Sequence, residues 1–163
     1  MKFQITGLNH RTAPVEVREK FAVVTSHLGT ASLELTTLED VAEGVVISTC
    51  NRTEFYLAGE HLSQEAMRRW LVAFKGLDPT AVGGHFYALE DAAAVRHALR
   101  VACGLDSMVL GEPQILGQLK QAYETSVSGK AVGKTLGKLM QYAFSVAKKV
   151  RTETAIGQTP VSV

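Results

Sequence analysis

Residues 44–57 read Gly-Val-Val-Ile-Ser-Thr-Cys-Asn-Arg-Thr-Glu-Phe-Tyr-Leu. The β-branched run at 44–49 is typical of a buried strand, and 54–57 is its expected hairpin partner, with the bend at residues 50–52. On either side of this hairpin, the sequence alternates between segments with strand spacing and segments with helical spacing of apolar residues. It predicts strands at 3–8 and 85–89, a helix over 26–38 behind a serine cap, and a helix from Ser63 through Lys75.

This order of elements, βαββαβ, is the ferredoxin-like order, in which two helices pack on one face of an antiparallel sheet. We therefore predict an α+β fold for residues 1–89. From Glu90 onward the apolar spacing is helical, and residues 90–155 are expected to form a helical subdomain that completes the domain. Residues 156–163 are interpreted as the start of a connection to a part of the protein that is missing here.

Composition narrows the class of protein. The chain has 163 residues, of which 46% are hydrophobic and 20% charged, and this mixture indicates one globular domain. It contains no unbroken apolar run of the roughly 18 residues that a membrane-spanning helix needs, and its first residues are unlike a signal peptide. We expect a cytoplasmic protein that does not enter membranes. Cys50 and Cys103 are expected to be free thiols, and no spacing of Cys and His indicates a metal site.

Charge is distributed unevenly along the chain. Through Gln114 there are 10 Lys and Arg against 14 Asp and Glu, and from Ile115 onward there are 7 against 2. A basic C-terminal third is compatible with a bound polyanion, although a solvated helix face is the commoner explanation. The cations concerned are expected to face outward from a long helix: Lys130, Lys134, Lys138, Lys148, Lys149 and Arg151.

Two residues are candidates for chemistry on local grounds. Cys50 follows a buried strand where the backbone turns, and Arg52 beside it could lower the pKa of the thiol, which would make Cys50 a nucleophile. A structural cysteine is the equal alternative. His97 is predicted to lie on the polar side of its helix, away from the stripe of Val95, Leu99 and Ala102, so it is either a surface histidine or a catalytic one.

The segment 104–114 joins two predicted helices and contains two glycines, a proline and several polar residues. Backbone amides at the start of the helix after Pro113 could bind a carboxylate or a phosphate, whereas the simpler interpretation is a structural loop. No G-x-G-x-x-G and no P-loop pattern occurs in the chain. We therefore expect no nucleotide cofactor to be bound by these residues.

Four segments, taken in order, resemble glutamyl-tRNA reductase. They are GLNHRTAPV at 7–15, STCNRTE at 48–54, GLDS at 104–107 with LGEPQILGQ at 110–118, and SVAKKVRTET at 145–154. The resemblance implies an N-terminal catalytic domain that continues into an NADPH-binding domain and a helical dimerisation domain, both missing here. It also implies glutamyl-tRNA as substrate, a homodimer of the full-length protein, and contact with the aminotransferase that receives glutamate 1-semialdehyde.

The resemblance further implies roles for individual residues. Cys50 would attack the ester that joins glutamate to tRNA and form a thioester, which NADPH then reduces. His97 would be needed for activity as a base, as a group that polarises the ester, or as an orienting donor. Arg52 would bind the glutamate carboxylate as a fork, with Glu54 holding the arginine in place. The substrate-contacting positions are Thr49, Asn51, Arg52, Glu54, Ser107, Glu112, Pro113, Gln114 and Gln118.

A non-catalytic RNA-binding module of ferredoxin-like topology is the alternative function. Such modules stack bases on aromatic side chains of the central strands. This chain offers only Phe55 and Tyr56 there, and adjacent strand residues point to opposite faces of a sheet. The pattern therefore favours the enzyme over the binding module.

Overall fold

The computed structural model describes residues 1–81 and 83–158. Its centre is a four-stranded antiparallel sheet in the order β2-β3-β1-β4. The strands are β1 Lys2–Asn9, β2 Val41–Ser48, β3 Arg52–Gly59 and β4 Tyr87–Glu90. All four coincide with predicted strands, so the prediction of a mixed α and β chain with an antiparallel sheet is confirmed.

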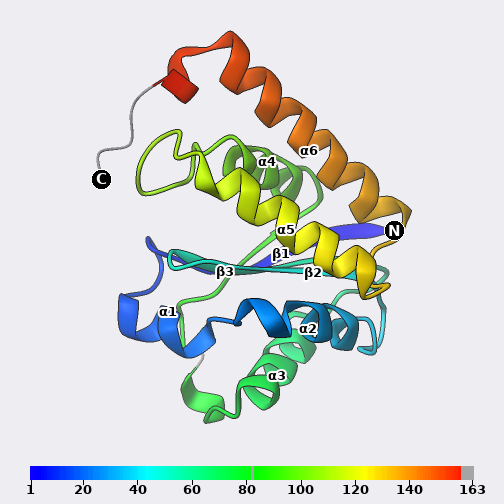
Figure 1. The fold of residues 1–163 in the computed structure, drawn as a ribbon. Coiled ribbons are helices and arrows are strands. Elements are labelled where there is room, and N and C mark those ends of the chain that lie inside the picture. The colour runs from blue at the N-terminus through cyan, green and yellow to red at the C-terminus, as the bar shows by residue number, and fades with distance from the viewer. Residues whose placement is uncertain (82, 159–163) are drawn as a thin grey trace.

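Helices cover both faces of this sheet (Figure 1). On one face lie α1 Val15–Phe21, α2 Leu28–Leu35 and α3 Gln64–Lys75. The other face is covered by α4 Asp91–Ala102, α5 Gln114–Ser128 and α6 Lys134–Glu153. Short 3-10 turns occur at Thr25–His27, Pro79–Ala81 and Ala155–Gln158.

The two faces of the central strands contribute to two hydrophobic cores. Val45, Ile47 and Tyr56 pack with residues of α4, α5 and α6, whereas Val46 and Phe55 pack with residues of α1, α2 and α3. Because both faces are buried, β2 and β3 carry apolar residues at consecutive positions, at 45–47 and 55–58. The helical second half therefore shares a core with the sheet.

The helix boundaries differ from the predicted ones in the first half. The helix expected over 26–38 is a 3-10 turn followed by α2, and Ser26 does not cap it, since His27 precedes the helix without a side-chain cap. The short helix α1 was not predicted. Ser63 does cap α3, because its hydroxyl accepts a hydrogen bond from the backbone N–H of Ala66 at 3.2 Å.

A buried carboxylate fixes the start of α6. Glu43 of β2 accepts hydrogen bonds from the backbone N–H groups of Gly133 at 2.6 Å, Thr135 at 3.2 Å and Leu136 at 2.9 Å. These are groups that a helix leaves unpaired in its first turn, and a negative charge there also complements the helix dipole. Within residues 1–81 and 83–158, no helix combines the length and apolar character needed to cross a membrane.

Candidate functional site

The hairpin turn between β2 and β3 presents Cys50 at its tip. The backbone N–H of Thr49 donates to the carbonyl of Arg52 at 2.8 Å, and the N–H of Asn51 donates to the Thr49 hydroxyl at 3.1 Å. Arg18 of α1 supports the turn by donating its Nε–H to the carbonyl oxygen of Cys50 at 3.3 Å. The Cys50 side chain is exposed, whereas Cys103 is buried.

Next to Cys50 is a small cavity of about 30 Å³, which has room for ordered water. It brings together residues from the hairpin turn, the loop after α4 and the first turns of α5. Its lining is Thr49, Cys50, Asn51, Arg52, Ser107, Glu112, Gln114, Ile115 and Gln118. Of the predicted site residues, Glu54, His97 and Pro113 do not line it.

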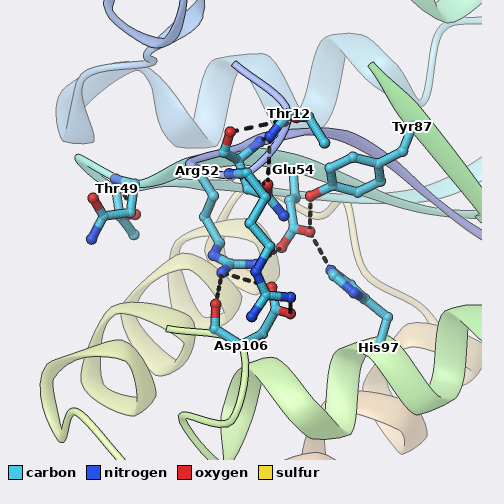
Figure 2. Close-up of polar contacts among 10 residues, drawn as sticks. Thr12, Thr49, Arg52, Glu54, Tyr87, His97 and Asp106 are labelled. Carbon is cyan, nitrogen blue, oxygen red and sulfur yellow. Dashed lines mark hydrogen bonds and ion pairs between the residues drawn. The ribbon is translucent and has the colours of Figure 1, made fainter. Parts of the chain in front are cut away.

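Arg52 forms the inner wall of the cavity and is only 2% exposed. One terminal nitrogen, Nη2, donates to the backbone carbonyl of Asp106 at 2.7 Å and to its carboxylate at 2.9 Å, and Nη1 donates to Glu54 at 3.4 Å (Figure 2). Burial lowers the pKa of Arg52, but the two carboxylates outweigh burial and raise it. Arg52 is therefore a fixed positive charge.

Glu54 is fully buried behind Arg52. Its second oxygen accepts a hydrogen bond from the Tyr87 hydroxyl and contacts Nε2 of His97 (Figure 2). Burial raises the pKa of Glu54, but His97, Arg52 and Tyr87 together lower it below its ordinary value. Burial and the Glu54 charge raise the pKa of Tyr87, so the phenol keeps its proton and donates a hydrogen bond to Glu54. The carboxylate is thus held ionised by three partners.

The predicted position of His97 on an outward polar side is wrong. The residues of α4 that face the sheet are Ala94, Ala98, Val101 and Ala102, so the buried stripe is rotated from the one expected. His97 lies three residues after Ala94 and four before Val101, on the same side of the helix. The side chain is 13% exposed and points inward to Glu54. It reaches the cavity only through Glu54 and Arg52.

Three residues that sequence reasoning missed complete this cluster: Tyr87, Asp106 and Arg11. Asp106 is 6% exposed. One of its carboxylate oxygens accepts a hydrogen bond from Nη2 of Arg52, and the other accepts one from Nη1 of Arg11 at 3.1 Å. Asp106 lies within the segment at 104–107 that carried the family resemblance, but nothing in the sequence pairs it with an arginine 54 positions earlier. Tyr87 is the first residue of β4 and gave no signal beyond strand propensity.

The loop between α4 and α5, on the other side of the cavity, is held by a hydrogen bond between its ends and by hydrogen bonds to α6. Gly104 and Gly111 both have positive φ, at 77° and 76°, and the N–H of Gly111 donates to the carbonyl of Gly104 at 3.0 Å. Arg151 of α6 donates to the carbonyls of Gly111 at 3.2 Å and Glu112 at 2.8 Å. The expectation that Arg151 faces outward is therefore wrong, because its guanidinium is hydrogen-bonded to two carbonyls of the loop.

The other expected features of this region lie as follows. Pro113 is exposed and directly precedes α5, without a side-chain cap. Lys148 and Lys149 are exposed on α6. Among the residues that the structure describes, no three His, Cys, Asp or Glu side chains are grouped as a metal ion would require.

Comparison with known proteins places this geometry in a family. A family model described as the N-terminal domain of glutamyl-tRNA(Glu) reductase matches residues 6–154. The glutamyl-tRNA reductase of Marinobacter nauticus is 52% identical over 157 residues, which are 96% of this chain and 37% of that protein. That of Pseudomonas fluorescens is 50% identical over 163 residues, which are 100% of this chain and 38% of that protein.

A solved structure agrees. The glutamyl-tRNA reductase from Methanopyrus kandleri superposes with a TM-score of 0.77 at 27% sequence identity, over 98% of this chain and 37% of that chain. The chain therefore spans somewhat more than a third of the length of the relatives it matches. On the family match and these identities, the chain belongs to the family of glutamyl-tRNA reductase N-terminal domains.

Proposed function

We propose that this chain is the part of a glutamyl-tRNA reductase that takes glutamate from tRNA onto a cysteine. The Cys50 thiolate attacks the carbonyl carbon of the aminoacyl ester, and the bond from that carbon to the ribose oxygen breaks. The ribose oxygen takes a proton, tRNA leaves, and glutamate stays on Cys50 as a thioester. The observation that carries this proposal is the exposed thiol at a cavity lined by Thr49, Asn51 and Arg52 from its own turn.

Arg52 is proposed to bind the side-chain carboxylate of the glutamate. A guanidinium has five N–H donors, and the Arg52 contacts with Glu54 and Asp106 occupy three of them. The Nε–H and one Nη1–H then lack a partner among the described residues, and either can donate a single hydrogen bond to the carboxylate, next to the positive charge of the guanidinium. Ser107, Gln114 and Gln118 line the same cavity and supply further polar groups for the substrate.

His97 is proposed to act as a positioning residue rather than as the base for Cys50. Its Nε2 contacts Oε2 of Glu54, the other oxygen of Glu54, Oε1, accepts a hydrogen bond from Arg52, and His97 itself does not line the Cys50 cavity. Among the three roles that the resemblance left open, this arrangement favours orientation. His97 keeps Glu54 in place, and Glu54 keeps the Arg52 guanidinium directed into the cavity.

The residues of this chain do not fit a nicotinamide dinucleotide. The sheet is antiparallel, so it lacks the parallel strand, glycine turn and helix that bind a pyrophosphate. Gly104 and Gly111 approach each other instead of leaving a cradle. We therefore derive no hydride step from these residues. NADPH, which would reduce the thioester to glutamate 1-semialdehyde, is proposed to bind in the part of the longer relatives that lies outside this chain.

We further propose that the full-length enzyme is a homodimer, that it transfers its product to an aminotransferase, and that it is located in the cytoplasm. Within the chain, the sheet order β2-β3-β1-β4 with helices α2 and α3 on one face supports the ferredoxin-like assignment of residues 1–89. Residues 90–155 are then the helical part of the same catalytic domain, and 156–163 begin the connection, of which 159–163 lie outside the described residues.

The alternative of an RNA-binding sheet has little support. Phe55 is fully buried and Tyr56 is 1% exposed, and the two belong to different cores on opposite faces of the sheet. A base cannot stack on either ring while helices cover both faces.

The proposed function is tested by following discharge of glutamyl-tRNA by this chain. We expect slow discharge, because the thioester is exposed to water and no hydride donor is present, and no consumption of NADPH. Cys50→Ala should reduce discharge to the rate of the uncatalysed ester, whereas the matched control Cys103→Ala should not. Equal discharge by the parent and Cys50→Ala would refute the proposed function.

A further inference from the structure

A cluster of arginines lies on the α1 side of Cys50. Arg11 is in the turn after β1, and Arg18 is in α1. The turn is rigid, because Asn9 accepts backbone hydrogen bonds from Thr12 and Ala13 and its side chain accepts another from Arg11. Arg18 connects this turn to the hairpin, since it donates to the carbonyls of both Ala13, at 2.8 Å, and Cys50, at 3.3 Å.

The arginines of this cluster are not fully neutralised by carboxylates. Asp106 pairs with both Arg11 and Arg52, and Glu54 is shared between Arg52 and His97. Arg18 has no carboxylate partner among the described residues; both of its contacts are to backbone carbonyls. The side chain of Arg11 is 60% exposed although it contacts Asp106, so its remaining donors face solvent.

His10 shows that these cations are close together. Its pKa is lowered first by burial and then by the charges of Arg52, Arg11 and Arg18, while only Asp106 acts in the opposite direction. Its Nδ1 atom is buried without a hydrogen-bond partner in the described part of the chain. Three arginines therefore act on one histidine, and all three come from the half of the chain that is acidic by composition.

We propose that Arg11 and Arg18 form a subsite for the 5′-phosphate of the terminal nucleotide of the tRNA. The inference rests on the proposed function, which brings the 3′-ester of that nucleotide to Cys50. The 5′-phosphate and the 3′-oxygen belong to the same ribose, so the phosphate must lie within one nucleotide of the thiol. A guanidinium is the side chain best suited to a phosphate, because its planar fork matches two phosphate oxygens.

The position of the two arginines makes the subsite specific for this phosphate. Glu112 lies in the cavity wall contributed by the loop after α4, so that side carries a carboxylate that repels phosphate. Arg18 contacts the backbone of Cys50 itself, and Arg11 is linked to the cavity by Asp106 and Arg52. The phosphate is thus expected on the α1 side of Cys50 and the glutamyl side chain on the Arg52 side.

Two minimal substrates test the subsite, 3′-O-glutamyl-adenosine and the same ester carrying a 5′-phosphate. The measurement is the second-order rate of glutamyl transfer to Cys50 for each, and their ratio in the parent chain. Since a hydrogen bond between charged groups is stronger than one between neutral groups, we expect a preference of about tenfold or more for the phosphorylated ester, weakening with added salt. Arg11→Gln should remove most of this preference, and Arg11→Lys, which keeps the charge, should restore part of it.

The control is Lys148→Gln, which removes an exposed cation from α6 and should leave the ratio as in the parent. Equal rates for the two esters in the parent, or an unchanged ratio in Arg11→Gln, would overturn the phosphate subsite while leaving transfer to Cys50 intact. If Cys50 is not acylated even by glutamyl-tRNA, the proposed function fails, and the subsite fails with it. Thermal unfolding of each variant shows whether the substitution has left the stability of the fold unchanged.

Discussion

Replacing Glu54 by glutamine should destabilise the chain strongly, although the two side chains have nearly the same shape. Glu54 is fully buried and has contacts with Arg52, Tyr87 and His97. Removing one partner of a buried ion pair costs about 3–5 kcal/mol, because the other charge stays buried without compensation. Arg52 retains two hydrogen bonds to Asp106, so we expect the lower end, about 3 kcal/mol.

The assay is urea unfolding of the parent and of Glu54→Gln at pH 7. With a slope of roughly 1–3 kcal/mol per molar urea, the midpoint should fall by about 1 M or more. The matched control is Glu65→Gln, which removes an exposed pair with Arg69 on α3 and should cost less than about 1 kcal/mol. If the two variants lose similar amounts of stability, the account of a tightly coupled Arg52 and Glu54 is wrong.

The stability of the parent and of Glu54→Gln should also differ in its dependence on pH. The pKa of Glu54 is lower in the folded chain than its ordinary value of 4.5, so its ionised form stabilises the fold above that value. As the pH falls below about 4.5, the unfolded chain takes up a proton first, and the advantage of the parent over Glu54→Gln should shrink. A difference that stays constant from pH 7 down to pH 3 would contradict the assignment of a stabilising carboxylate.

Two further predictions concern the substrate. Arg52→Gln should slow transfer from glutamyl-tRNA and abolish discrimination against glutaminyl-tRNA, because the positive charge that binds the carboxylate is lost. Single-turnover labelling with both tRNAs measures this, and unchanged discrimination would assign the carboxylate to another group. The double variant of Lys148 and Lys149 to alanine should leave the salt dependence of tRNA binding as in the parent, since we place the nearest phosphate at Arg11 and Arg18. A slope smaller by roughly 0.7–0.9 per lost contact would instead show that α6 binds tRNA.

The sequence was sufficient for the elements that depend on local signals. The strand run at 44–49 and the hairpin after it stand out because β-branched residues adjoin a polar turn, and Ser63 marks the start of α3 by its capping chemistry. The short helix α1 was missed because seven residues with four charges carry almost no periodic signal. Ser26 looked like a cap, but a 3-10 turn at Thr25–His27 precedes α2.

The cavity residues were predicted largely from the family resemblance, because they occur in the short motifs at 48–54 and 104–118. The cluster behind them could not be predicted, since it depends on long-range contacts. Tyr87 meets Glu54 because β4 and β3 both pair with β1, and His97 turns inward because small alanines let α4 approach the sheet. The basic C-terminal third suggested phosphate binding at α6, whereas in the fold Arg18, from the acidic half, contacts the backbone of Cys50, and Arg11 pairs with Asp106.

The proposed function requires that glutamate move from tRNA to Cys50. The most direct test mixes this chain with tRNA charged with radiolabelled glutamate, quenches in acid, digests the protein and identifies the labelled peptide by mass spectrometry. We predict that the label is on the peptide containing Cys50, is released by hydroxylamine as a thioester should be, and is absent from Cys50→Ala. Label on another residue, or a folded chain that discharges the tRNA without ever carrying glutamate, would contradict the claim.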